Sequence, residues 1–226
     1  MEPTIDTYTW VFALHMIVIG YYMGSDFVVD QWTWYLIKSR KDPAEERVRK
    51  LKFLLICDQH PRMGLILFIA TGFSVEALAG LSPLVPADLW GVWLICAVWF
   101  AEVWISFLNE HKPWGKRIVD LDVVWRFLVG GTFLVTGAWS LVGEGPFAPH
   151  WMALKYLLLG CLIAGGVSIR FFVRDLAKAL PEFMKTGSTP TFEAIVDRTL
   201  FLAMKVNWGL WALFITMAVL TIWRPF

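Results

Sequence analysis

Three ionisable side chains, His15, Glu76 and Lys155, lie inside long apolar segments of the sequence rather than in the polar connections between them. At a helical rise of 1.5 Å per residue, His15 lies roughly 9 Å and Lys155 roughly 6 Å inside its segment, and Glu76 lies at a similar level in another. Ionisable groups at such depths in a membrane are costly, so each is a candidate functional residue.

The chemistry that His15 and Lys155 could perform together is the ligation of haem iron. A neutral imidazole inside a helical bundle is a good iron ligand. An amine ligates iron only when it is deprotonated, and burial in a medium of low dielectric favours that neutral form. His15 and Lys155 are therefore candidate axial and metal ligands. Two other interpretations stay open: Lys155 extends to the outer headgroups, and His15 makes a hydrogen bond between helices.

A second candidate group lies where another apolar helix is expected to begin. His60 and Arg62 flank a proline there, and proline suits the first turn of a helix. The two side chains could hold an anionic group, such as a propionate or a lipid phosphate, at the positive end of that helix. The alternative is an ordinary helix start with an arginine at the membrane interface. His111 and His150 lie in or beside loops and are expected to be solvated.

Asp26 also lies inside an apolar segment, toward the inner side of the membrane, whereas His15 lies toward the outer side. An isolated carboxylate at that depth would have to be protonated, so a charged Asp26 needs a partner. The sequence offers Arg62 and Lys205 as cations at a comparable level. We therefore predict a structural ion pair between Asp26 and a cation.

The composition indicates that the whole chain belongs in a membrane. Hydrophobic residues make up 58% of the 226 residues and charged residues only 17%. A typical soluble domain has about 45–50% apolar and about 25% charged residues, and a single core could not enclose so much apolar surface. The formal net charge of +1 argues against a nucleic-acid partner, because such binding needs a basic surface.

Six segments are long enough to cross a bilayer, which takes roughly 20 mainly apolar residues. They cover approximately residues 9–32, 61–81, 89–108, 123–141, 151–171 and 200–222. No linker or low-complexity tract separates them. The sequence thus predicts an all-α, polytopic membrane helix bundle of about six transmembrane helices, in which residues 1–226 form a single transmembrane domain.

The distribution of lysine and arginine predicts the orientation of this bundle. These residues gather in the connections 38–52, 112–117 and 170–198, whereas 82–88 and 142–150 contain none. Short connections rich in lysine and arginine stay in the cytoplasm. We therefore expect both the N-terminus and the C-terminus outside, in a multi-pass protein of the bacterial inner (cytoplasmic) membrane.

Four short elements, taken in order, carry a resemblance to a known family. They are His15 in the first apolar segment, Pro61 and Met63 at the start of the second, Trp151 and Lys155 in the fifth, and Arg198, Asn207, Pro225 and Phe226 in and after the last. In this pattern the chain resembles the HemJ-type protoporphyrinogen oxidases, within the wider group that includes CopD-like membrane proteins.

The resemblance implies a four-helix membrane haem core in which His15 and Lys155 coordinate a haem b. Residues 83–146 have no counterpart and are expected to form an inserted helical hairpin. Glu76 would lie next to the ligands, and His60 and Arg62 would be further cofactor contacts. The implied function is that of a haem oxidoreductase or electron-transfer protein, protoporphyrinogen oxidase-like in its most specific form. Its electrons would pass to quinone or to a redox partner subunit.

Two other functions stay open from the sequence. One is a haem-free accessory subunit of a larger membrane complex, with the tryptophan-rich hairpin as its docking surface. The other is copper handling of the CopD-like kind, for which Met16, Met23 and Met63 offer soft ligands beside the histidines. The absence of an MxxM or HxxM repeat places copper last. Membrane lipid is an expected partner in each case, and the choice between homo- and hetero-oligomer stays open.

Overall fold

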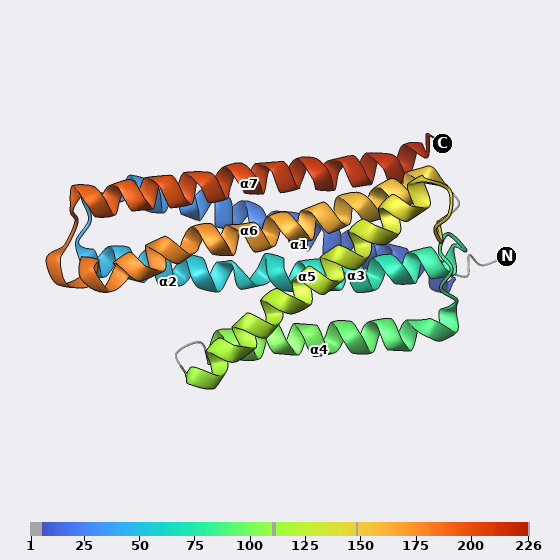
Figure 1. Cartoon of the computed structure of the whole chain (residues 1–226), viewed down its shortest axis with the longest axis horizontal. Coiled ribbons are helices and arrows are strands. Elements are labelled where there is room, and N and C mark those ends of the chain that lie inside the picture. The colour runs from blue at the N-terminus through green and yellow to red at the C-terminus, as the bar shows by residue number, and fades with distance from the viewer. Residues whose placement is uncertain (1–5, 110–111, 148, 226) are drawn as a thin grey trace.

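The computed structural model describes residues 6–109, 112–147 and 149–225, and these residues are all-α (Figure 1). The elements are α1 (Thr7–Lys38), α2 (Ala44–Cys57), α3 (Gln59–Leu78), the short 3-10 helix η1 (Pro86–Asp88), α4 (Leu89–Leu108), α5 (Pro113–Leu141), α6 (His150–Thr186) and α7 (Pro190–Trp223). The predicted helical class is confirmed. His111 and Phe226 lie outside the described residues.

Five helical segments are long and apolar enough to cross a membrane, which supports a multi-pass membrane protein. They are Thr7–Lys38, Ala44–Leu78, Pro86–Leu108, His150–Thr186 and Pro190–Trp223. The remaining predicted segment, 123–141, is helical as the second half of α5 but is not among these five. This segment contains one charged residue, Arg126, and directly follows Asp122.

The helices run back and forth between two ends of the molecule (Figure 1). The first turn of α1, the last turn of α7 and the connections that lead from α3 to α4 and from α5 to α6 lie at one end, which we call the terminal end. The connections 39–43 and 187–189 lie at the other, which we call the basic end because the lysine- and arginine-rich connections gather there. The exception to this reversal is the step from α2 to α3, which continue in the same direction.

Helices α1, α3, α6 and α7 pack together, α5 packs along α6, and α4 contacts both α3 and α5. Glycines allow the closest of these contacts. A Cβ at Gly137 on α5 would lie 2.5 Å from the backbone nitrogen of Leu157, and a Cβ at Gly160 on α6 would lie 2.6 Å from Leu134. Small residues at contacts are typical of membrane helices, which associate through close packing.

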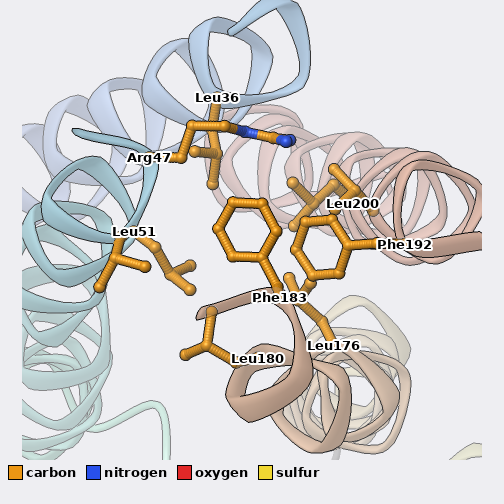
Figure 2. A pocket seen from close by; sticks show the side chains of 10 residues that line it. Leu36, Arg47, Leu51, Leu176, Leu180, Phe183, Phe192 and Leu200 are labelled. Carbon is orange, nitrogen blue, oxygen red and sulfur yellow. The ribbon is translucent and has the colours of Figure 1, made fainter. Parts of the chain in front are cut away.

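At the basic end, α2 packs over the last turns of α6 and the first turns of α7. The side chains there surround a cavity of about 20 Å³ (Figure 2). Its walls are apolar except for one guanidinium; they comprise Leu36, Arg47, Val48, Leu51, Leu176, Leu180, Phe183, Phe192, Val196 and Leu200. A space of this size could hold one water, but apolar cavities stay dry. The cavity is therefore a packing space and not a ligand site.

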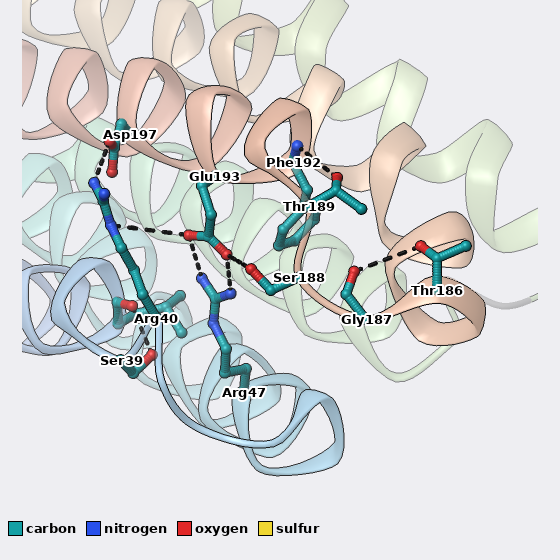
Figure 3. Close-up of polar contacts among 11 residues, drawn as sticks. Ser39, Arg40, Arg47, Thr186, Gly187, Ser188, Thr189, Phe192, Glu193 and Asp197 are labelled. Carbon is teal, nitrogen blue, oxygen red and sulfur yellow. Dashed lines mark hydrogen bonds and ion pairs between the residues drawn. The ribbon is translucent and has the colours of Figure 1, made fainter.

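Beside this cavity, Glu193 at the start of α7 ties the α1–α2 region to the rest of the bundle (Figure 3). Both terminal nitrogens of Arg47 donate to the Glu193 carboxylate, the second over 3.1 Å. Ser188 donates to the same carboxylate over 2.5 Å, and Arg40 Nε lies 3.9 Å from it. The Arg47 side chain is only 3% exposed, so this pair is shielded from solvent.

The pair between Arg47 and Glu193 should make stability depend on pH. Burial raises the pKa of Glu193, but the hydrogen bonds from Arg47 and Ser188 and the nearby charges outweigh it, so the pKa lies below its usual value. A depressed pKa in the folded state gives stability that is present above the unfolded value, about 4.3, and is lost as pH falls below it. We expect the unfolding temperature of the wild type to drop on acidification through this range.

The measurement is thermal unfolding in detergent between about pH 6 and 3, comparing the wild type with Glu193→Gln. The variant should unfold at a lower temperature at pH 6 and show a flatter pH profile. Glu46→Gln is the control, because Glu46 pairs at the surface with Arg49, which is 78% exposed. Parallel profiles for the wild type and Glu193→Gln would contradict this assignment.

Candidate functional site

The structure brings His15, Glu76 and Lys155 together in the half of the bundle next to the terminal end. Lys155 Nζ lies 3.4 Å from Glu76 Oε1 and is close enough to His15 to act on it electrostatically. We call these three residues, with Thr71 and Tyr156, the polar centre. Their predicted common depth therefore corresponds to real proximity across α1, α3 and α6.

Glu76 is the central acceptor of this group. It is 9% exposed and receives a hydrogen bond from the Tyr156 hydroxyl over 2.8 Å. It also pairs with Lys155, the residue before Tyr156 on α6. The Lys155 ammonium also lies 5.7 Å from the centre of the Trp151 ring. A nitrogen engaged with a carboxylate oxygen in this way is not free to ligate a metal. Lys155 could therefore serve as an axial ligand only if it left Glu76.

His15 has the surroundings of an oriented ligand. Its Nδ1 lies 2.8 Å from the Thr71 hydroxyl oxygen, and that hydroxyl lies 2.7 Å from the Leu67 carbonyl oxygen. Because the single hydroxyl proton is donated to the Leu67 carbonyl, the Thr71 oxygen must accept a hydrogen bond from His15 Nδ1–H. The neutral imidazole then carries its lone pair on Nε2. Phe68 stacks on the ring at 5.1 Å between centroids and limits its rotation.

These residues fit a haem in part. A metal-ligating histidine usually donates its other ring N–H to a fixed acceptor, as His15 does to Thr71. Gly72 has no side chain against the ring, where a Cβ would lie 3.4 Å from His15 Cε1. His15 therefore fits as one axial ligand, whereas Lys155 is occupied by Glu76 in this arrangement. Across the described residues, no group of three or more histidine, cysteine, aspartate or glutamate side chains could hold a metal ion.

His60 and Arg62 lie at the start of α3, away from the polar centre, and form a separate group. His60 is exposed, with its Nδ1 2.8 Å from the Tyr21 hydroxyl, and Arg62 pairs with Asp58 one turn earlier. Along the helix, His60 is about 16 residues from Glu76, or roughly 24 Å. His15 itself contacts Thr71, which is about 11 residues from His60 along α3, or roughly 16 Å, so His60 and Arg62 lie outside the polar centre.

The predicted ion pair of Asp26 with a cation is wrong. Asp26 is buried, but its carboxylate accepts a hydrogen bond from the Trp211 indole over 2.6 Å. Arg62 is bonded to Asp58 within its own chain segment, and Lys205 is exposed. The reason is the packing of α1 against α7, which places the indole N–H of Trp211 where a cation was expected.

A buried ionic group on α5 was not anticipated from the sequence. Asp122 has no exposed surface and accepts hydrogen bonds from Trp99 at 3.1 Å and from Arg126 Nε at 3.0 Å, and it forms an ion pair with Arg170 of α6. We call Trp99, Asp122, Arg126 and Arg170 the arginine cluster. The spacing of four between Asp122 and Arg126 is a signal that could have identified that pair. Arg170 is brought in by the contact between α5 and α6, for which the sequence has no local signal.

Comparison with known proteins identifies no relative of this chain. No protein-family model, curated protein or solved structure matches it. The resemblance to the HemJ-type family thus rests on the short elements described above and stays a prediction.

Proposed function

We propose that the chain crosses the bacterial inner membrane six times, with both termini outside. Five segments are long and apolar enough to span, and α5 connects α4 at the basic end to α6 at the terminal end. Two termini at the same end require an even number of crossings (Figure 1). The basic end would face the cytoplasm, because lysine- and arginine-rich connections stay there.

This topology can be tested with single cysteines in a background without Cys57, Cys96 and Cys161. Substitutions at Lys41 and Lys116, both exposed at the basic end, should react only when the reagent reaches the cytoplasm. A cysteine at the exposed Glu144 should react with an impermeant reagent from outside. Labelling of the Glu144 position from the cytoplasmic side alone would contradict six crossings.

We further propose that the polar centre holds a b-type haem with His15 as an axial ligand, and that the protein is a membrane haem oxidoreductase or electron-transfer protein. The observation that carries this proposal is the hydrogen-bond chain from His15 through Thr71 to Leu67, which leaves Nε2 with its lone pair. A bound haem would supply one-electron redox chemistry. Protoporphyrinogen oxidation is the most specific version and rests on the family resemblance, as does transfer to quinone or a partner subunit.

The chain's own residues would bind and orient rather than react. Thr71 and Phe68 hold the imidazole in one orientation, which reduces the entropy lost on binding. The pair of Glu76 and Lys155 adds no net charge beside it. Lys155 as the second ligand, inferred from the sequence, requires that this pair open on binding, so it stays a prediction.

The test is the visible absorption spectrum of the full chain purified in mild detergent. We expect a Soret band, with α and β bands that sharpen on reduction. Protein that is monodisperse and helical but remains colourless, and that takes up no haem when haem is added, would contradict the proposal. The supply of haem during expression should be varied, so that a low yield of cofactor is distinguished from an absent site.

A second candidate function, the haem-free accessory subunit, is favoured by a different observation. Glu76 joins Tyr156 and Lys155 of α6 to α3, which is sufficient to make the polar centre a structural link. The hairpin also exposes large aromatic side chains, including Trp90 at 73% and Trp104 at 42%. The same spectrum separates the two candidates, because this function predicts a stable, colourless protein.

A further inference from the structure

The arginine cluster contains donors that the chain itself does not satisfy. Arg126 Nη2 and Arg170 Nη1 are buried and have no hydrogen-bond partner within the described part of the chain, and the same is true of Trp125 Nε1. Asp122 takes up Arg126 Nε and Arg170 Nη2, which leaves one nitrogen of each guanidinium facing no acceptor. Buried charged donors are costly to leave unpaired, so an acceptor from outside the chain would stabilise them.

The charges of the cluster favour an anion. Among the ion pairs of the described residues, Arg126 and Arg170 share one carboxylate, that of Asp122. One negative charge therefore faces two positive charges. Arg62 adds a positive charge within electrostatic reach of Arg170, although Asp58 pairs with it. Glu102 on α4 lies within electrostatic reach of the arginines without pairing with either. Glu102 therefore opposes a bound anion but does not replace it.

The position of the cluster favours a phosphate at the membrane surface. Arg126 and Arg170 lie where the apolar parts of α5 and α6 end, toward the basic end. Arg170 is about 15 residues from Lys155 on the same helix, or roughly 22 Å, so this site is distinct from the polar centre. The Arg170 side chain is 20% exposed, so a ligand can approach it from the surface of the bundle. Basic pockets between membrane helices at this level bind lipid headgroups.

We propose that the arginine cluster binds a phosphate oxyanion, with Arg126 Nη2 and Arg170 Nη1 as its donors and the neighbouring Trp125 indole as a third. The phosphodiester of an anionic lipid is the source that the depth of the site favours; free phosphate has the same chemistry. Guanidinium groups suit this ligand because two N–H donors match two phosphate oxygens. Trp99, which packs against both Arg126 and Trp125, would sense the bound anion.

The experiment titrates the full, delipidated chain in neutral detergent with three probes, followed by tryptophan fluorescence and checked by native mass spectrometry. The probes are dihexanoyl-phosphatidylglycerol, dihexanoylglycerol, which has no phosphate, and inorganic phosphate. We expect saturable binding of the phosphatidylglycerol and none of the dihexanoylglycerol. Binding of inorganic phosphate with similar affinity would support the site but assign it to a free anion.

Three variants test the donors. Arg170→Lys keeps the charge beside Asp122 but loses the second donor, so affinity should fall about tenfold or more. Glu102→Gln removes a repelling charge and should tighten binding severalfold. Arg174→Lys, on the exposed surface of α6 one turn further, should bind as the wild type does. If Arg170→Lys does not fold, Glu102→Gln still decides, since it removes no bond. Unchanged affinity in Glu102→Gln, or binding of dihexanoylglycerol as strong as that of phosphatidylglycerol, would overturn the proposal.

Discussion

His15→Ala should abolish haem binding by the purified protein. Of the two nitrogen ligands in the polar centre, the imidazole is the one that is not engaged with Glu76, because Lys155 is paired with that carboxylate. Loss of a residue that only orients a metal ligand costs about 10–100-fold in affinity, and loss of the ligand itself should exceed that range. The measurement is the molar ratio of haem to protein after purification and after titration with added haem.

Three further variants make this result specific. Thr71→Val removes the acceptor for His15 Nδ1 and should weaken haem binding by about 10–100-fold. His60→Ala should retain the haem, because His60 lies at the opposite end of α3 beside Tyr21. Lys155→Ala should also retain it, and a change of spin state there would show that Lys155 is the second ligand. Full haem occupancy in His15→Ala, or its loss in His60→Ala, would refute the assignment.

Asp122→Asn should cause the largest loss of stability of any single polar substitution in the described chain. Asp122 is fully buried and is the shared partner of Arg126 and Arg170. Its neutralisation leaves two guanidinium charges close together with no carboxylate bonded to them. Removal of one partner from a buried ionic group typically costs about 3–5 kcal/mol. The free energy of unfolding should therefore fall by about that amount, measured by denaturant titration in mixed micelles.

A matched substitution at the surface separates burial from charge. Glu46→Gln removes the partner of Arg49, which is 78% exposed, and should change the free energy of unfolding by less than about 1 kcal/mol. Asp122→Asn combined with Arg126→Met should recover part of the lost stability, because the uncompensated charge is then reduced. A loss below about 1 kcal/mol in Asp122→Asn alone would mean that the arginines find another acceptor, such as Glu102.

The sequence by itself determined where most of the long apolar helices lie. The predicted segment 89–108 coincides with α4, and the segments 9–32, 151–171 and 200–222 lie within α1, α6 and α7. Runs of apolar residues about 20 long have few alternatives to helix in a bilayer, since every backbone group must be bonded within the segment. The predictions fell short beyond the apolar runs: α1 continues to Lys38 and α6 to Thr186, because a helix needs apolar side chains only where it meets lipid.

The depth of each ionisable residue could also be read from the sequence, and it predicted that His15, Glu76 and Lys155 share one layer. What that depth could not give is the partner of each group. The tertiary structure alone decided that Tyr156 donates a hydrogen bond to Glu76 and that Trp211 donates one to Asp26. It also decided that Arg170 forms an ion pair with Asp122. The physical reason is that hydropathy fixes how far a residue lies along a helix axis. The rotation of each helix and the identity of its neighbour depend instead on close packing at residues such as Gly137 and Gly160, summed over the whole bundle.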